Sequence, residues 1–288
     1  MVDLDDKYLY LPKQYQAKHD ICWGLVKELE EFLLNEKYIE LSAQAFKLEE
    51  NLLEKLKNYE GDIFQFLLDH DKKKEHDHAV KLQLIRGVIL DSCYFLQEAL
   101  SASLKKRLSV AFSLFRRPLV YNMVMMIRLH TENDFLEKFI QGKVHPKAKD
   151  NSFDPAKMDS IQLKRVLSED NFFSRFFGKD IFEFVFDKSN PDSLINMTNR
   201  ALHPVTSFNE NNATGAMNIN FAFSTEQDTL SQWDYIYRRI LFIIFFYVTL
   251  LDVVVFTNIK ESEEMEVLFN NRILNRQNLM SSIFGQPQ

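Results

Sequence analysis

The chain has 288 residues, a formal net charge of −6, and only 7 glycines and 7 prolines against 26 phenylalanines. Few turn-forming residues and many large apolar ones favour long helices over many short strands, in one large domain or two small ones. The negative charge argues against an overall basic surface for nucleic acids but leaves room for a local basic patch.

The cysteines and the N-terminal residues indicate the compartment. Cys22 and Cys93 each lie in apolar, helix-like sequence, and their spacing matches neither a disulfide framework nor a zinc knuckle. We therefore expect two reduced core thiols. The first ten residues, MVDLDDKYLY, lack the basic and apolar regions of a secretion signal. These features predict a cytoplasmic protein.

The N-terminal half predicts long helices packed roughly antiparallel. Apolar residues recur at helical spacing in runs over 25–33, 48–56, 79–100 and 108–130. The polar stretch DHDKKKEHDH separates the second run from the third. Pro118 lies inside the fourth run, where we expect a kink, because proline removes a backbone donor and crowds the preceding turn.

The second half begins with a predicted loop over 142–160, which holds two prolines and mixed charges. Large apolar side chains recur at every second residue within 216–224, which predicts one short extended segment or hairpin arm there. The alternating residues are Ile219, Phe221 and Phe223. Ser224 or Thr225 is expected to cap the next helix. The predicted class is an all-α bundle of long antiparallel helices with this one extended exception.

The predicted organisation has three parts, which could form a single domain. They are an N-terminal helical hairpin over 1–70, a main bundle over 71–260 and an amphipathic helix over 261–288. The apolar residues of the last helix would be available for a homo-oligomer or a protein partner. They are Val267, Leu268, Ile273, Leu274, Met280, Ile283 and Phe284.

The longest apolar run, within RRILFIIFFYVTLLDVVVF at 238–256, poses a choice between membrane and core. The run from Ile240 to Phe256 is 17 residues long and apolar except for Thr249 and Asp252, and as a helix it would span about 25 Å, the lower edge of a membrane span. Asp252 argues against a span, because a carboxylate there costs roughly 1–3 kcal/mol on insertion. The other helices also need a central apolar partner. We predict a buried core helix, with membrane association through 238–256 as the alternative.

The segment NMTNRALHPVTS is the most site-like part of the sequence. Arg200 and His203 are three residues apart, a spacing that places both on one helical face, where such a pair can hold a phosphate and transfer a proton. Asn199 is expected to assist. The structural alternative is that Asn199 and His203 cap a helix that Pro204 ends.

Helix order and short motifs carry a resemblance. The motifs are LFRRPLVYNMV, NRALHPVT and NINFAFS, followed by the apolar closing helix. Over residues 75–258 the chain resembles the HEPN (higher eukaryotes and prokaryotes nucleotide-binding) superfamily, and uncharacterised bacterial helical proteins found near toxin and phage-defence genes. The resemblance implies a role in bacterial defence. Ribonucleases of that superfamily have an Arg followed four to six residues later by a His, and no Arg here has a His at that spacing. This departure argues against metal-independent RNA cleavage and leaves a binding or scaffold role open.

The charged stretch HDKKKEHDH is a candidate metal site. Histidine and carboxylate side chains ligate divalent metals, and the stretch supplies both. These residues are His70, Asp71, His76, Asp77 and His78. Because they lie among lysines in a helix connection, we predict a solvated charged turn and no metal site.

A basic group on neighbouring helical turns is a candidate for binding a phosphate backbone or an anionic lipid surface. Its members are Lys105, Lys106, Arg107, Arg116 and Arg117. The alternative is a solvated helix start, with Arg116 or Arg117 paired to an acid. No Gly-rich phosphate loop or nucleophile motif occurs, and we expect no cofactor.

These signals favour an α-helical protein that works through binding, as a homo-oligomer with RNA or a protein partner, in bacterial defence or a stress response. The first alternative is a metal-independent ribonuclease that uses Arg200 and His203. The second is a membrane-associated protein.

Overall fold

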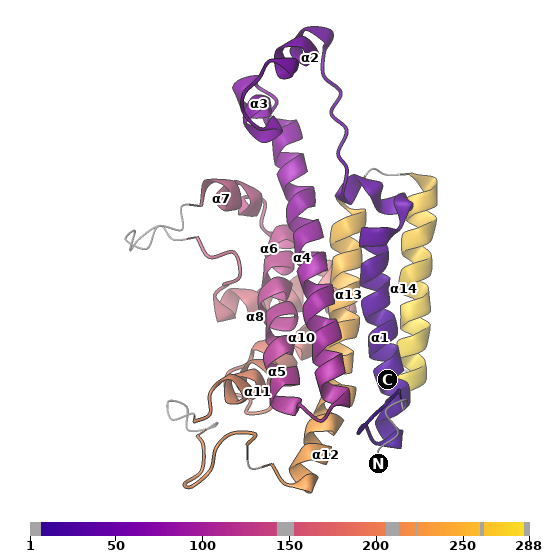
Figure 1. Cartoon of the computed structure of the whole chain (residues 1–288), viewed down its shortest axis with the longest axis vertical. Coiled ribbons are helices and arrows are strands. Elements are labelled where there is room, and N and C mark those ends of the chain that lie inside the picture. Colours follow the sequence, from indigo (N-terminus) through magenta and orange to yellow (C-terminus); the bar gives the residue numbers. More distant parts are fainter. Residues whose placement is uncertain (1–6, 143–152, 206–212, 223, 260–261, 285–288) are drawn as a thin grey trace.

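A computed structural model describes residues 7–142, 153–205, 213–222, 224–259 and 262–284. Within these ranges the fold is all-α, as the sequence predicted, and it contains no strand (Figure 1). The first elements are α1 (Lys13–Leu34), the 3-10 helix η1 (Glu36–Leu41), α2 (Glu50–Lys57), α3 (Ile63–Asp69), α4 (Lys73–Leu104), α5 (Leu108–Arg116), the π-helical turn η2 (Arg117–Asn122) and α6 (Met123–Thr131). The later ones are α7 (Phe135–Gln141), α8 (Ser160–Glu169), α9 (Asn171–Arg175), α10 (Gly178–Ile181), η3 (Phe182–Phe186), α11 (Leu194–Leu202), α12 (Glu226–Tyr235), η5 (Ile236–Ile240), α13 (Leu241–Phe256) and α14 (Glu263–Phe284).

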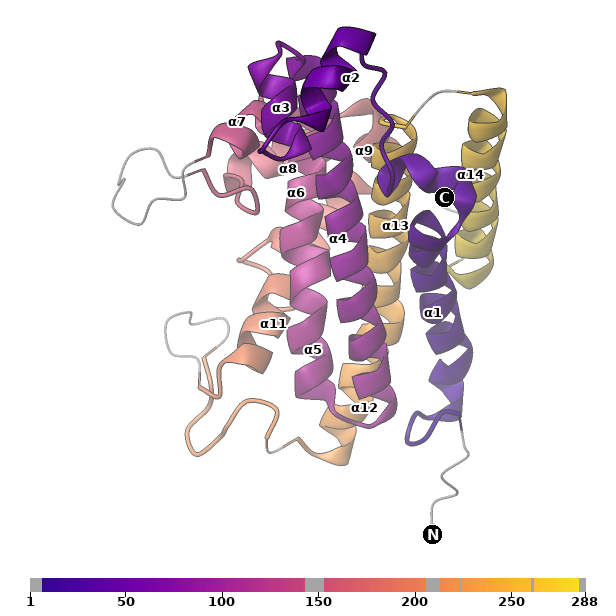
Figure 2. The same ribbon diagram turned by 45° about the horizontal axis from the view of Figure 1, so that its top comes forward.

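Long helices form a bundle around α13. Helices α1, α4, α6 and α14 all contact α13, and α5 packs between α4 and α11. Helix α4 extends beyond the bundle and carries α2 and α3 at its far end (Figures 1 and 2). Helices α7, α8 and α11 lie on the side of the bundle opposite α14 (Figure 1).

Helix α13 is buried on all sides because neighbours surround it. Every residue from Ile243 to Val255 is buried, Asp252 included. A helix that is apolar nearly all round is stable only in such a position or in lipid. The prediction of a core helix is confirmed for this fold.

Two helical stretches are long and apolar enough to cross a membrane by length and composition. They are Leu108–Thr131 and Glu226–Phe256, and 61% and 83% of their most apolar windows are buried inside the fold. Core helices of bundles meet the same criteria, so these stretches are weak grounds for a membrane location.

Pro118 does not end its helix. The chain is helical from Leu108 to Thr131 and passes Pro118 in the π-helical turn η2. A π turn inserts one extra residue, which accommodates the missing N–H and the bulk of the proline ring. The predicted distortion is therefore a local widening, and Pro118 itself is buried.

The prediction of an extended segment over 216–224 is wrong for its described part. The backbone there forms turns, with a left-handed φ of 61° at Phe221. A strand needs a neighbour to complete its hydrogen bonds, and none lies beside it in the described chain. The backbone N–H of Asn220 donates instead to the carbonyl of Pro204 over 2.8 Å. Phe223 lies outside the described residues.

Two smaller predictions are confirmed. Cys22 and Cys93 are free and buried, and burial raises the pKa of the Cys93 thiol to about 12. Thr225 rather than Ser224 caps α12: its hydroxyl accepts from the N–H of Asp228 over 3.1 Å, and the Asp228 carboxylate accepts from the Thr225 N–H over 2.8 Å. This reciprocal capping box starts the long helix that continues into α13.

The boundary expected near residue 70 falls in the turn between α3 and α4. Helix α1 packs against α4 and α13, and its buried residues belong to the main hydrophobic core. The helix expected over 261–288 is α14, which packs along α13.

Candidate functional site

Helix α11 and the segment before it are fixed by asparagines. The side-chain amide of Asn196, 2% exposed, donates to the carbonyls of Lys188 and Asn190 over 3.0 and 2.8 Å. At the other end the backbone N–H of His203 donates to the carbonyl of Asn199 over 3.0 Å, and Pro204 follows. The Asn196 contacts fix the start of α11 against the segment before it, and the backbone bond at His203 closes the last helical turn, so the fold orients the side chains that α11 presents.

Arg200 lines an open cleft between α11, the loop over 213–222 and α12. One Nη atom lies 3.3 Å from the carbonyl oxygen of Pro191, and it also contacts the sulfur of Met197. The Nε–H is buried and has no hydrogen-bond partner among the described residues. The cleft encloses about 940 Å³ of empty space, including its mouth. A half-buried guanidinium with an unused donor suits the binding of an anionic or polar ligand.

The other cleft-lining groups are mostly neutral and polar. They include Asn218, Asn220, Ser224, Ser231, Gln232 and Tyr235, together with the acids Asp192 and Asp228. The hydroxyl of Tyr235 donates to the carbonyl of Asp192 over 2.8 Å, and burial raises the pKa of Tyr235, so the hydroxyl stays protonated. The carboxylate of Asp228 is engaged in the capping box. Arg200 is therefore the one cation among the described residues that line the cleft, beside two carboxylates.

His203 lies outside this cleft. Its side chain is exposed and is not among the groups that line the cleft in the described chain. Its carbonyl accepts from the side-chain amide of Asn220 over 2.8 Å, which fastens the loop over 213–222 to the end of α11. The structure thus gives Arg200 and His203 different surroundings, and the local role of His203 matches the structural alternative.

Asn199 is committed to another helix. Its side-chain oxygen accepts from Nη1 of Arg116, whose Nε donates to the hydroxyl of Tyr121 over 2.8 Å. The guanidinium also stacks over the Tyr121 ring, 5.3 Å from its centroid. Asn199 therefore ties α11 to α5.

The predicted basic group does not form one surface. Arg116 faces α11, whereas Arg117 lies over the ring of Phe95 on α4 and donates to Asp91 over 2.9 Å. Successive helical residues point about 100° apart, so neighbours in sequence reach different helices. The remaining members, exposed at the turn between α4 and α5, are Lys105, Lys106 and Arg107.

The histidine-rich stretch is divided between two elements. His70 ends α3 and stacks on Phe66, with its Nδ1 2.9 Å from the Phe66 carbonyl oxygen. His76 is buried in the first turn of α4 and lies 2.8 Å from Asp77. Only residues 70–72 form the predicted charged turn. Asp71 in this turn has a left-handed φ of 59°. Among the described residues, no cluster of His, Cys, Asp or Glu is arranged to hold a metal.

A buried ion cluster, which the sequence did not predict, joins α1, α13 and α14. Asp252 is 0% exposed and accepts from Arg272 over 3.0 Å and from Arg276 over 2.6 Å. Glu28 accepts from Arg276 over 2.6 Å, and Glu31 accepts from Arg272 over 2.9 Å. We call these five residues the ion cluster. Arg272 and Arg276 are only 8% and 4% exposed, so the carboxylates, and not water, compensate their positive charges.

The feature of the sequence that could have revealed the ion cluster is the spacing of Arg272 and Arg276. Residues four apart lie on one helical face, and Arg272 and Arg276 therefore point together toward α13. Asp252 was recognised as unusual within an apolar run. Its partners were missed because nothing local in the sequence connects the three helices.

The apolar face of α14 is mostly used within the chain. Leu268, Met280 and Ile283 pack against the core, and Ile273 lines a pocket beside α13. Of the residues expected to be available for association, those exposed are Val267 and Leu274, at 55% and 54%. The side chain of Phe284 lies outside the described structure.

Comparison with known proteins adds no relative. No family model matches the chain, and no curated protein or solved structure is significantly similar to it.

Proposed function

We propose that the chain is an α-helical binding protein, a HEPN-like effector in bacterial defence or a stress response, which binds RNA in its Arg200 cleft. The observation that carries the proposal is the half-buried guanidinium of Arg200, which lines a cleft open to solvent and whose Nε–H has no hydrogen-bond partner among the described residues. The defence setting rests on the sequence resemblance alone, and the cytoplasmic location rests on the two cysteines and the N-terminal residues.

The chemistry of the cleft suits a single-stranded segment. A guanidinium forms charge-assisted hydrogen bonds with phosphate oxygens. The exposed amide of Asn218 at the rim offers both a donor and an acceptor, which suits the edge of an unpaired base. Because the protein carries a net charge of −6, binding must rely on this local site.

Fluorescence anisotropy with a labelled single-stranded RNA tests the proposal. Arg200→Gln is expected to weaken binding by about tenfold or more, since a hydrogen bond to a charged group is lost. The matched control is Arg165→Gln, an exposed arginine of α8 that does not line the cleft. Equal affinities for the wild type and Arg200→Gln, or no RNA binding, would reject the proposal.

Binding is a better candidate than cleavage because the acid–base residue of the ribonuclease alternative, His203, does not line the cleft. The same RNA incubated with the wild type and with His203→Ala separates the two. Intact RNA in both samples agrees with binding. Cleavage by the wild type that His203→Ala abolishes would support the ribonuclease.

Self-association is part of the proposal. Val267 and Leu274 are seven residues apart, so they lie on one outward face of α14. Light scattering after size exclusion is expected to give a homo-oligomer, and Val267→Glu with Leu274→Glu is expected to reduce it to a monomer. A wild-type monomer would remove this part.

A further inference from the structure

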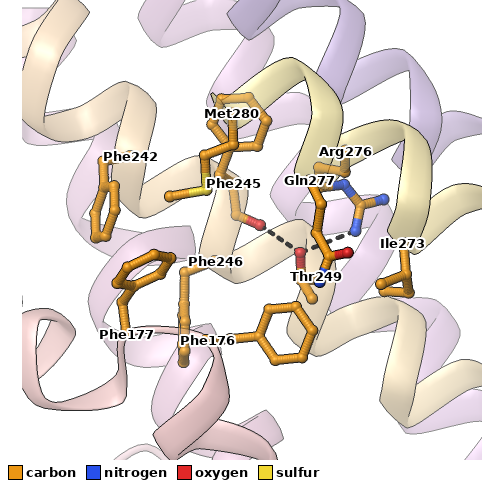
Figure 3. Close-up of a pocket in the computed structure, with 10 residues that line it drawn as sticks. All are labelled: Phe176, Phe177, Phe242, Phe245, Phe246, Thr249, Ile273, Arg276, Gln277 and Met280. Atoms are coloured by element: carbon orange, nitrogen blue, oxygen red, sulfur yellow. Dashed lines mark hydrogen bonds between the residues drawn. The ribbon is translucent and has the colours of Figure 1, made fainter. Parts of the chain in front are cut away.

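The described helices differ in how closely they pack against their neighbours. Between α13 and α14, Figure 3 shows Arg276 hydrogen-bonded to Thr249, and the side chains around them leave room for about one water molecule. A pocket beside the middle of α4 is far larger and holds about 820 Å³ of empty space, including its mouth. A space of this size admits a small organic molecule.

Three parts of the chain form this pocket, which we call the α4 pocket. The segment after η1 runs beside α4 on its way to α2 (Figure 1), and the side-chain amide of Gln44 fixes it there by donating to the carbonyl of Ala79 over 3.1 Å. The start of α3 and the middle of α4 supply the other walls. The lining residues on which the ligand depends are Leu41, Phe46, Ile63, Phe64, Arg86 and Gly87.

Arg86 is the one charged residue among the described residues that line the α4 pocket. Its side chain is half-buried, and its guanidinium has no hydrogen bond or ion pair within the described part of the chain. The carboxylate of Asp62, which begins α3, is used by its own helix and accepts from the N–H of Gln65 over 2.9 Å. The positive charge of Arg86 is therefore available to an anion that enters the pocket.

The apolar walls favour an organic anion over an inorganic one. Leu41 is buried, whereas Phe46, Ile63 and Phe64 are half-buried and keep part of their surface open. An apolar group that leaves water to contact such walls is stabilised. An inorganic anion has no such group and gains nothing from them.

The number of charges favours a carboxylate over a phosphate. A planar guanidinium binds both oxygens of a carboxylate, and one cation balances its single negative charge. A phosphate monoester carries close to two negative charges at neutral pH, and the described lining of the pocket offers no second cation.

We infer that the α4 pocket binds a small organic monoanion, a carboxylate with an attached apolar group. The carboxylate pairs with the guanidinium of Arg86, and the apolar group lies against Phe46 and Phe64. The α4 pocket and the Arg200 cleft share no described lining residue, so this site does not depend on the proposed RNA binding.

Four probes titrated into the full chain by ligand-observed NMR test the inference. Phenylacetate has the carboxylate and the ring, phenylacetamide replaces the charge with a neutral amide, acetate lacks the ring, and inorganic phosphate is an anion without an apolar group. Phenylacetate is expected to bind about tenfold more tightly than each of the others. Absence of phenylacetate binding, or an equal affinity for any other probe, would overturn the inference.

Arg86→Gln tests the cation. The variant removes no hydrogen bond or ion pair of the described fold, so the chain is expected to stay folded. Its affinity for phenylacetate is expected to fall about tenfold, to that for phenylacetamide, while its RNA affinity stays unchanged. The control Arg165→Gln does not touch the pocket and is expected to bind phenylacetate like the wild type. A preference for phenylacetate that persists in Arg86→Gln counts against the inference.

Gly87→Leu tests the location. Gly87 is an exposed residue of α4 that lines the pocket, and a Cβ added there meets no atom within 4 Å. A leucine is therefore expected to occupy the pocket or its mouth without a clash, to favour the helix, and to weaken phenylacetate binding about tenfold. The matched control is Gly24→Leu, at an equally open, exposed position of α1 away from the pocket. If Gly87→Leu binds phenylacetate as tightly as Gly24→Leu does, the ligand does not bind in this pocket.

Discussion

Two sets of arginines in the molecule meet opposite surroundings. Arg272 and Arg276 are buried against α13, and carboxylates from two helices surround them. Arg200 is half-buried at an open cleft, and its hydrogen-bond acceptors in the described chain are a carbonyl and a thioether. Partnered arginines inside a fold hold helices together, whereas an uncommitted arginine at a cleft is available to a ligand. The contrast separates the structural charges from the candidate functional one.

The largest effect is expected when the ion cluster loses its central carboxylate. Asp252→Ala leaves two buried guanidinium groups without their central partner, and it is expected to reduce the free energy of unfolding by about 3–5 kcal/mol. Urea denaturation measures the loss. The control Asp234→Ala removes a half-exposed carboxylate that is paired with Arg238 and accepts from the Tyr15 hydroxyl over 3.4 Å, and it is expected to cost about 1 kcal/mol or less. Similar losses in the two variants would show that the ion cluster does not fix α14.

A buried histidine gives the next effect, through pH. His19 is 3% exposed, its Nδ1 lies 2.9 Å from the hydroxyl of Tyr237, and burial lowers the pKa of His19 to about 4. Between that value and 6.5 the unfolded chain binds a proton that the folded one does not, so stability falls as the pH falls through this window. The loss at pH 5 relative to neutral pH is expected to be about 2 kcal/mol.

Denaturation at several pH values checks this. His19→Gln is expected to flatten the dependence, whereas His203→Gln, at an exposed position, is expected to retain it. Burial also lowers the pKa of His130, which contributes in the same direction in both variants. A slope that His19→Gln leaves unchanged would assign the pH dependence to other groups.

A smaller effect is expected where a neutral buried hydrogen bond is removed. The hydroxyl of Tyr247, at the centre of the bundle, lies 2.7 Å from Ser92 Oγ, which in turn donates to the carbonyl of Val88 over 2.7 Å. Tyr247→Phe is expected to cost about 1 kcal/mol. The exposed Tyr94 provides the control, and Tyr94→Phe is expected to leave the thermal midpoint unchanged. If Tyr247→Phe is as stable as the wild type, the hydroxyl network adds no stability.

The smallest stability effect is expected at the cleft. Arg200→Gln removes no ion pair from the described structure, so its free energy of unfolding is expected to stay within about 0.5 kcal/mol of the wild type. The same variant is expected to lose RNA affinity, and this combination distinguishes a binding residue from a structural one. If Arg200→Gln instead lowers the free energy of unfolding by several kcal/mol, Arg200 is a structural residue like Arg272 and Arg276.

The sequence predicted those features that depend on nearby residues. Apolar periodicity, together with few glycines and prolines, indicated the helices, and the length of the run ending at Phe256 indicated its central place. The N-cap at Thr225 was also local. Arg200 was singled out because it lies beside other polar residues in a short motif.

Features that depend on long-range packing could not be predicted. Asp252 pairs with two arginines of α14, and these arginines pair in turn with carboxylates of α1 that lie more than two hundred residues away in the chain. No periodicity in the sequence connects the three helices. The place of His203 depends on how Asn220 brings the loop back to the end of α11. The separation of Arg116 from Arg117 depends on which helices lie on either side of α5.

The ion cluster also has a consequence for synthesis of the chain on the ribosome. Glu28 and Arg276 are separated by 248 positions, and Asp252 lies between them in the sequence. At roughly 5–20 residues per second, α14 follows α1 after about 12–50 s. Until then Asp252 has no guanidinium partner. Helix α13 therefore cannot be buried in the bundle while the Asp252 carboxylate is ionised. Completion of the core therefore waits for the last helix, and chains interrupted before Arg272 are expected to be the ones that proteases and chaperones recognise.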